Sequence, residues 1–402
     1  MSDAADDGAA AQKIGAYLAC MRAKLRASGK GEQNAEMLLV SRTDGVLSIE
    51  DHGGWAQRNE SMTRMLRELD AAGELPDFAP ILIQTGDRCI AKRAADGALQ
   101  LDLWQRQPVP DKLRAQINLQ RVVSMCSSPK YADVPVPDWC FDAWPEGGVA
   151  QGGFDAACAA LAAAGAALPT DGKMLSWAGT AHHHPSRMQL VKLASEHPER
   201  LAVNNHAVDA KSDAAAAAAA PATASGAPPP QQRAQYRSLV EQVRRCAYLL
   251  DVQGKGYSSR VKLLLHSGRL VFLAHRPWQE YFHAGLVPFT HYVPVREDLS
   301  DLVDQLDWAD AHPDKAATIA AQSQEFARAH LTAAAARQAL RAALVTTAES
   351  GSAALVKAAA WRATMTAAAG EGGCVAAVLP SFIESSFTTK VAYEEWCKLR
   401  VA

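Results

Sequence analysis

The 402-residue sequence lacks a long apolar run, a strong net charge of either sign and a basic cluster with interleaved aromatic residues. No stretch of about 18 uncharged apolar residues occurs, so no segment is predicted to span a membrane. The formal net charge is −2, which does not favour a nucleic-acid partner. The first residues, MSDAADD, are acidic and no basic region precedes an apolar one. No secretory signal is therefore predicted, and a complete chain of this kind is expected to be cytoplasmic.

Metal-binding patterns are also missing. The eight cysteines form no CxxC pair and no metal-ligand spacing. Cys126 and Cys140 flank a proline-rich segment and could form a disulfide in an oxidising compartment, whereas Cys158 is expected to be a small buried apolar residue. The histidines at 182–184 are not predicted to bind a metal, because three adjacent side chains do not converge easily on one ion. Contact with phosphate, or a solvated loop, is the preferred interpretation.

Apolar patterns of two periods alternate along the chain and predict an α/β fold. Residues 35–50 read as a hairpin about the turn Thr43-Asp44-Gly45. Strands are expected within 78–88, 121–128, 173–179, 248–252 and 269–274, and helices within 10–28, 56–73, 154–168, 185–197, 256–268 and 315–369. The alternation indicates a largely parallel sheet.

Two segments interrupt this pattern. Residues 129–149 contain four prolines, two tryptophans and three aspartates, which exclude a helix or a central strand. A long aromatic loop inside a compact domain is more often functional than incidental. Residues 207–233 contain a run of seven alanines followed by a Pro/Gly/Ser-rich tract, and are predicted to be a low-complexity surface insertion.

A strand, a glycine-rich turn and a helix follow one another in YLLDVQGKGYSSR, from Tyr248 to Arg260. Gly254 and Gly256 would let the backbone approach a ligand closely, and the following helix N-terminus could hold an anion. Ser258 or Ser259 is expected to cap that helix or bind phosphate, and Arg260 could hold a diphosphate. An ordinary strand-to-helix turn is the alternative interpretation.

The next stretch has an unusually specific order. Trp278, Glu280 and Tyr281-Phe282 are followed by Pro288, by His291-Tyr292-Val293-Pro294-Val295 and by Asp298-Leu299-Ser300. Upstream lie two further blocks, the 14-residue run from Asp133 to Glu146 and Trp177-Ala178-Gly179 followed by Arg187. In this order the blocks resemble glycosyltransferase family 90, the CAP10-like or protein O-glucosyltransferase (Rumi-type) family, over roughly residues 120–335.

The resemblance implies an α/β protein of the GT-B fold, with two Rossmann-like domains facing a cleft and a long C-terminal helical segment. Residues 1–170 would form the acceptor-side domain, and residues 171–345, with the insertion 207–233, the nucleotide-sugar domain. Residues 346–402 would be helices packing across the domain junction.

The resemblance also implies an activity. The chain would transfer glucose or xylose, with inversion, from UDP-glucose or UDP-xylose to a hydroxyl acceptor on a protein or glycan. It would need no metal or other cofactor and would be a monomer. The family implies the secretory pathway (ER or Golgi lumen), which conflicts with the absent signal. Two alternatives stay open, a nucleotide-sugar-binding pseudoenzyme without transfer, and a transferase (such as a xylosyltransferase) acting on a capsular or wall polysaccharide.

The family's roles fall on particular residues. Asp133 would be the general base, with Asp138 as its rival; either carboxylate could instead order the loop. Without a metal, cations must stabilise the departing UDP, and the family has an arginine where this chain has Ala178. The predicted nucleotide-sugar site comprises Gly179, Thr180, Arg187, Gly254, Gly256, Ser258, Ser259, Arg260 and Glu280, the last binding ribose or being structural. Asp138, Trp139, Phe141 and Trp144 are expected on the acceptor or sugar side, or simply to pack.

Overall fold

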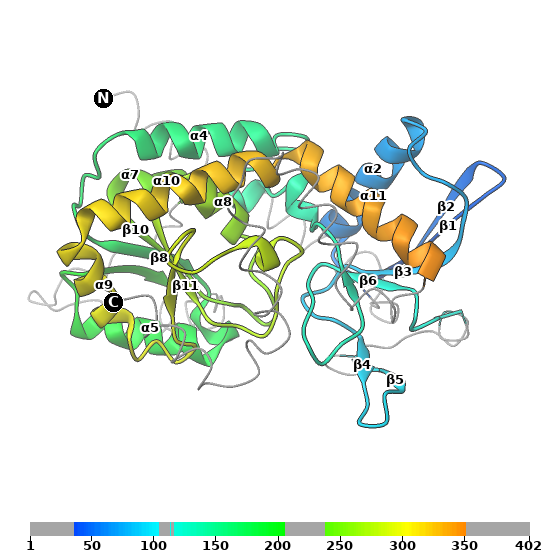
Figure 1. The fold of residues 1–402 in the computed structure, drawn as a ribbon, viewed down its shortest axis with the longest axis horizontal. Helices are drawn as coiled ribbons and strands as arrows, with labels where there is room; N and C mark the ends of the chain where they lie inside the picture. Colours follow the sequence, from blue (N-terminus) through cyan, green and yellow to red (C-terminus); the bar gives the residue numbers. More distant parts are fainter. Residues whose placement is uncertain (1–35, 104–112, 114–115, 206–237, 351–402) are drawn as a thin grey trace, which may run out of the picture. The chain divides into compact units, whose positions relative to one another are not determined.

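The computed structural model describes residues 36–103, 113, 116–205 and 238–350. The chain divides into two compact units, residues 1–357 and 358–402, and the second lies outside the described residues. The predicted helix at 10–28, the insertion 207–233 and residues 351–402 of the predicted C-terminal segment also lie outside them. Two five-stranded sheets, with helices against each, confirm the α/β class (Figure 1).

The first sheet is mixed, in the order β2-β1-β3-β6-β7. Strand β1 pairs antiparallel with β2 and β3, whereas β3, β6 and β7 are parallel to one another. The strands are β1 (Met37–Thr43), β2 (Val46–Asp51), β3 (Phe78–Gln84), β6 (Val122–Ser124) and β7 (Val134–Pro135). Asp44 and Gly45 both have positive φ, 50° and 76°, as a two-residue hairpin turn requires, so the predicted hairpin is confirmed.

Helices α2 (Ala56–Ala71) and α11 (Ala333–Ser350) pack with this sheet. The predicted apolar face of α2, with Met62, Met65, Leu66 and Leu69, is buried. A separate small hairpin, β4 (Ala91–Arg93) and β5 (Leu99–Leu101), follows β3.

The second sheet is entirely parallel, in the order β12-β11-β10-β8-β9. Its strands are β8 (Leu175–Gly179), β9 (Leu201–Asn205), β10 (Tyr248–Asp251), β11 (Leu270–Ala274) and β12 (Val293–Val295). Helices α5 (Pro185–Glu196) and α9 (Leu302–Ala311) cover one face. Helices α4 (Phe154–Ala166), α7 (Leu239–Arg245), α8 (Val261–His266) and α10 (Pro313–His330) cover the other (Figure 1).

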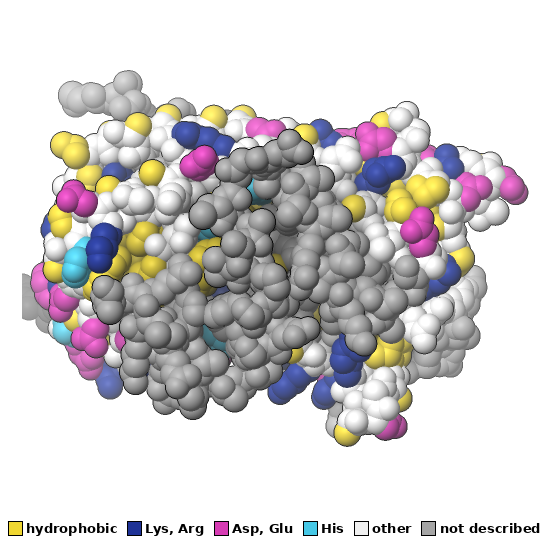
Figure 2. All heavy atoms as spheres, in the orientation of Figure 1, with side chains coloured by type: hydrophobic (Ala, Val, Ile, Leu, Met, Phe, Trp, Pro, Cys, Tyr) yellow, Lys and Arg dark blue, Asp and Glu magenta, His cyan; other side chains and the backbone are white. Residues whose placement is uncertain are grey.

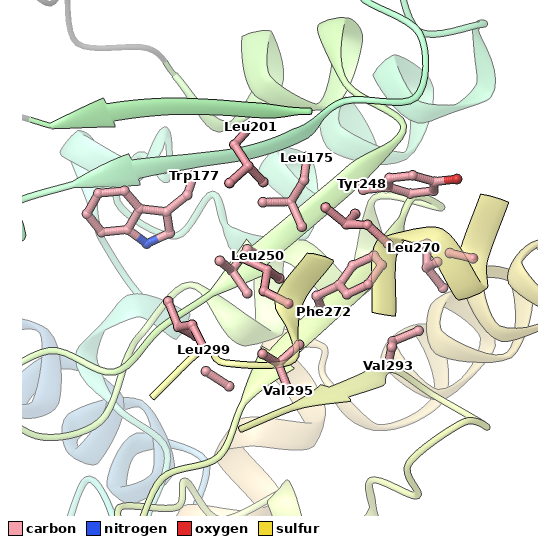
Figure 3. Packing of buried hydrophobic residues seen from close by; sticks show 14 of the residues in the cluster. Leu175, Trp177, Leu201, Tyr248, Leu250, Leu270, Phe272, Val293, Val295 and Leu299 are labelled. Carbon is pink, nitrogen blue, oxygen red and sulfur yellow. The ribbon is translucent and has the colours of Figure 1, made fainter. Parts of the chain in front are cut away.

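The strand order of the second sheet reverses between β8 and β10. In open parallel sheets the crevice outside the carboxyl ends of two such strands is where ligands bind. The apolar cluster beneath this place is well packed, and Figure 3 shows Trp177 and Tyr248 at opposite ends of it. Trp177 is the middle residue of β8 and is fully buried.

Two consecutive helices, α10 and α11, pack on different sheets. Helix α10 contacts α8 and β11, and α11 contacts β3, β6 and β7. Helix α4, which the predicted boundary at residue 170 assigns to the first domain, packs against α7 and α8 of the second sheet. A Cβ added to Gly165 of α4 would lie 1.7 Å from the carbonyl oxygen of Ser267, so this contact is between backbones.

Of two local predictions, one is wrong and one is confirmed. Helix α8 begins at Val261 with Arg260 as its N-cap residue, so neither Ser258 nor Ser259 caps it. Residues 129–149 hold only the short strand β7 and two 3-10 turns, η3 (Trp139–Phe141) and η4 (Pro145–Gly147), which confirms the irregular loop. In the described part of the chain, no helix is long and apolar enough to cross a membrane.

Candidate active site

Three arginines converge beyond the carboxyl ends of β8, β10 and β11. Arg187 comes from α5, Arg260 directly precedes α8, and Arg276 follows β11. All three are less than a tenth exposed. Arg187 and Arg260 were predicted from the sequence, and the structure brings them together at one aromatic ring, since each guanidinium carbon lies 5.4 Å from the Trp177 ring centroid.

Asp251, the last residue of β10, holds two of these cations. Its carboxylate lies 2.5 Å from Nη1 of Arg276 and 3.3 Å from Nε of Arg260, and it accepts a 2.7 Å hydrogen bond from the Ser258 hydroxyl. Burial alone would raise the pKa of Asp251, but the two guanidiniums outweigh it and hold the pKa below its usual range. Ser258 therefore orders Asp251 in this structure.

Arg187 is held by backbone carbonyls. It donates to the oxygens of Gln253, Thr180 and Val252 at 2.8, 3.2 and 3.0 Å. Burial and the neighbouring Arg260 lower its pKa to about 9. The lowered pKa means that the charged form of Arg187 is destabilised in this site, and a bound anion would stabilise it. Three guanidiniums, of which Asp251 pairs with two, therefore give this edge of the sheet an excess of positive charge.

The charge is local. Over the described part of the face in Figure 2, acidic and basic side chains are interspersed, in keeping with the formal net charge of −2. The described part of that face therefore forms no general basic surface. Preorganised cations at a ligand-binding edge are the arrangement that stabilises phosphate oxygens.

The glycines of the predicted turn have different neighbours. A Cβ on Gly254 would lie 3.4 Å from Nη2 of Arg187, an ordinary contact. A Cβ on Gly256 would lie 1.6 Å from the carbonyl oxygen of Asp87, in the loop after β3. Gly256 thus permits close approach by the chain's own backbone. Gly179 makes room for a side chain instead, because a Cβ there would lie 2.8 Å from the Trp177 ring.

The loop after β3 lies against this turn. Arg88 donates through Nε to the carbonyl of Lys255 at 2.5 Å, and Tyr257 donates its N–H to the carbonyl of Asp87 at 3.4 Å. The Asp87 carboxylate is 31% exposed and pairs with Arg58 at 2.8 Å. Burial raises the pKa of Asp87, but Arg58, Lys255 and His183 together lower it by more than burial raises it. The carboxylate is therefore ionised at neutral pH.

Asp133, the predicted base, is placed differently. It is 2% exposed. One carboxylate oxygen accepts from the Ile90 N–H at 2.8 Å and the Ser124 hydroxyl at 2.5 Å, and the other accepts from the Ala91 N–H at 2.8 Å. Burial raises its pKa and the hydrogen bonds oppose that shift. This carboxylate joins β4 to β7 and has its oxygens directed into the protein.

Asp138 and Glu280 meet at a buried lysine. Nζ of Lys262 lies 3.1 Å from Asp138 and 2.5 Å from Glu280, and donates to the carbonyl of Ser259 at 2.9 Å. Burial raises the pKa of Glu280 to about 8, although Lys262 lowers it. The pair joins the 129–149 loop to the segment after β11. Glu280 is 3% exposed, a placement that favours the structural interpretation over ribose binding.

The loop aromatics largely pack. Trp139 and Phe141 are 7% and 3% exposed, and Trp144 meets Trp139 edge-on at 5.9 Å. Trp55, the N-cap residue of α2, is by contrast an exposed aromatic, with 51% of its surface accessible. The Arg58 guanidinium lies 5.8 Å from the Trp55 ring and 5.5 Å from the Trp139 ring, so Trp55 is beside the ion pair with Asp87.

The histidines at 182–184 have different surroundings. His184 is the N-cap residue of α5, and its side chain accepts from the Ser186 N–H. Burial and Arg187 lower the pKa of His183 to about 4, so this ring is neutral beside the arginines. Among the described residues, no group of three or more His, Cys, Asp or Glu side chains is arranged to hold a metal ion.

Sequence reasoning missed Asp87, Arg276 and Lys262. A signal for Asp87 was available, because a buried strand ends at Gly86-Asp87 and carboxyl ends of parallel strands are where ligands bind. Arg276 and Lys262 had no such signal, since a basic residue near a strand end or in a helix is usually solvated.

The fold and site define an α/β protein with a cationic site at the switch point of a parallel sheet. The family model "Glycosyl transferase family 90" matches residues 72–338, about two thirds of the chain, and the chain therefore belongs to that family. This confirms the resemblance drawn from the three sequence blocks.

Individual relatives match over a shorter stretch. Protein O-glucosyltransferase 2 of Danio rerio is 39% identical over 84 residues, which is 21% of this chain and 17% of that protein. Protein O-glucosyltransferase 1 of Homo sapiens is 39% identical over 84 residues, 21% of each chain. Human protein O-glucosyltransferase 3 is 35% identical over 81 residues, 20% of this chain and 16% of that protein. The match spans about a fifth of each relative's length.

Proposed function

We propose that this protein transfers a sugar from a nucleoside diphosphate sugar to a hydroxyl acceptor. The observation that carries the proposal is the group formed by Arg187, Arg260 and Arg276 at the switch point of the parallel sheet. A leaving nucleoside diphosphate develops negative charge at its phosphate oxygens, and fixed guanidiniums stabilise that charge without a metal. Membership of family 90 and the protein O-glucosyltransferase relatives support a sugar as the transferred group.

Arg276 also bears on the missing family arginine. Ala178 is at the carboxyl end of β8, and its carbonyl accepts a hydrogen bond from Arg260. Arg276 brings a third guanidinium to the same place from the end of β11. We infer that it supplies the charge that Ala178 cannot, which favours the enzyme over a pseudoenzyme.

For the base, the geometry favours Asp87 over Asp133, whose role stays a prediction. Asp87 is ionised and partly accessible, and its loop contacts the turn that carries Gly256. In the proposed step the Asp87 carboxylate takes the proton of the acceptor hydroxyl while that oxygen attacks the anomeric carbon. The bond from this carbon to the diphosphate breaks with inversion, and the electron pair leaves with the nucleotide beside the arginines.

The finer assignments rest on the resemblance. We propose UDP-glucose or UDP-xylose as donor, a GT-B arrangement of the two sheets, no metal requirement, a monomer, and action in the secretory pathway. A protein serine or a glycan hydroxyl is the proposed acceptor. Trp55 is the side chain best placed to contact it, being exposed beside the Arg58–Asp87 pair.

A donor panel tests the proposal. UDP release is measured with UDP-glucose, UDP-xylose and UDP-galactose, with and without serine peptides and simple glycosides as acceptors. We expect release from at least one of the first two donors, stimulated by an acceptor. Tight UDP binding without release from any donor would identify a binding module, and the absence of both would remove the proposed function.

A further inference from the structure

Two buried cysteines lie beside each other in the segments that follow the neighbouring parallel strands β3 and β6. Cys89 follows the loop after β3 and directly precedes Ile90 and β4, and Cys126 follows β6. Their sulfurs are 3.9 Å apart, and the Cys89 thiol also donates to the carbonyl of Cys126 at 3.1 Å. Both are free thiols, 2% and 0% exposed.

We propose that Cys89 and Cys126 are a disulfide site, oxidised when the chain folds in an oxidising compartment. A disulfide needs sulfurs ~2 Å apart, so each sulfur has to move by only about 1 Å, which small rotations about the Cα–Cβ bonds provide. The sequence suggested Cys126 with Cys140 instead. The structure gives Cys126 a different neighbour, 37 residues away along the chain.

The chemistry is a thiol–disulfide exchange. A thiolate of the pair attacks an external disulfide of the glutathione or protein-disulfide class and forms a mixed disulfide. The second cysteine displaces the external thiol. In total the two cysteine thiols lose two protons and two electrons, and the oxidant is reduced to two thiols. Because both sulfurs are buried in the folded protein, the exchange takes place during folding, and the finished bond is shielded from reductant.

The crosslink would hold the segment that carries Asp87. Cys89 is two residues beyond Asp87, and the Cys126 sulfur lies 3.7 Å from the Asp87 carbonyl. The two residues after Cys89, Ile90 and Ala91, donate their N–H groups to Asp133. The bond would thus fix this loop to β6 at its base. Only this consequence rests on the proposed function; the disulfide itself does not.

The test is a peptide map of the full chain refolded in a glutathione redox buffer. The protein is denatured, alkylated with iodoacetamide without reduction, digested and examined by mass spectrometry. We expect a crosslinked peptide containing Cys89 and Cys126, two hydrogens lighter than its parts, and an alkylated Cys140. Full alkylation of Cys89 and Cys126, or a Cys126–Cys140 peptide, would overturn the proposal.

Thermal unfolding gives an independent readout. Protein refolded with reductant should melt about 5 °C below protein refolded in the glutathione buffer, for the wild type and for Cys140→Ser alike, because it lacks a crosslink that closes a long loop. The double variant Cys89→Ser/Cys126→Ser should melt near the reduced wild type and should not respond to reductant. A reductant effect that persists in the double variant would contradict the assignment. Neither readout needs a nucleotide-sugar. Failure of the disulfide proposal can therefore be told apart from failure of the proposed function.

Discussion

Asp251 and Asp87 occupy comparable places in the two sheets, one ending β10 and the other following β3, yet their surroundings differ. Asp251 is fully buried, with Arg276, Arg260 and Ser258 on its carboxylate. Asp87 is 31% exposed, and the structure pairs it with Arg58. A carboxylate whose lone pairs are occupied organises its neighbours, whereas an accessible one can accept a proton. This difference supports the proposal that the second sheet binds the anion and the first carries the proton-transfer group.

The largest effect on nucleotide binding is expected at the second sheet. Arg260→Ala should weaken UDP binding by about 100-fold, because it removes a charge-assisted contact from a buried site. Isothermal titration with UDP measures this, and Arg260→Lys should lose roughly 10-fold because it keeps the charge without the fork. Arg200→Ala is the matched control, since Arg200 precedes β9 at the opposite end of the sheet and pairs with Asp307 and Asp310. Equal affinities in all four proteins would mean that the arginine group does not bind the nucleotide.

Contact between the two regions is tested at the glycines. Gly256→Ala should cost about 1–3 kcal/mol of unfolding free energy, because its Cβ would meet the Asp87 carbonyl. Gly254→Ala should cost less than about 1 kcal/mol, since its Cβ only touches Arg187. Urea unfolding of the two variants gives the difference. Equal stability of both would show that the loop after β3 does not contact the turn in solution.

The buried lysine should make stability depend on pH. The pKa of Glu280 is about 8 in the folded protein, against an ordinary value of 4.5. Its contribution to the free energy of unfolding is therefore fully present below pH 4.5 and is lost as the pH rises through 8. The wild type should lose about 3 kcal/mol between pH 6 and 9 in excess of Glu280→Gln. Urea titrations across this range measure the difference. Glu68→Gln, an exposed position on α2, should behave as the wild type, and an identical slope in Glu280→Gln would refute the buried acid.

The smallest effect is expected on the acceptor side of the first sheet. Trp55→Ala should lower transfer to the best acceptor of the panel by roughly 5-fold, equivalent to about 1 kcal/mol, while hydrolysis of the donor by water is unchanged. Val46→Ala, at a 68% exposed position in the β1–β2 hairpin, is the control. Loss of donor hydrolysis in Trp55→Ala would place this residue on the donor side instead.

The sequence predicted the elements well and the pairing of side chains less well. The hairpin, α2, the parallel strands β8, β10 and β11 and the irregular loop follow from local periodicity and turn residues, which depend on neighbours in the chain. The edge strands β9 and β12 were not predicted. Arg187 and Arg260 came from the family motifs. Their meeting at Trp177 and Asp251 depends on strand order, which local patterns do not contain. Burial of Glu280 against Lys262, and the neighbour of Cys126, likewise depend on contacts between distant segments.

The comparison is tested most directly by UDP release from a saturating donor in Asp87→Asn and Asp133→Asn, with the folded fraction and UDP affinity measured in parallel. We predict that Asp87→Asn lowers the rate by about 10³-fold at unchanged UDP affinity, because it removes the base alone. We predict that Asp133→Asn, corrected for its folded fraction, stays within roughly 10-fold of the wild type, because it disturbs a loop rather than the proton transfer. Wild-type rates in Asp87→Asn, with activity abolished in folded Asp133→Asn, would contradict the account.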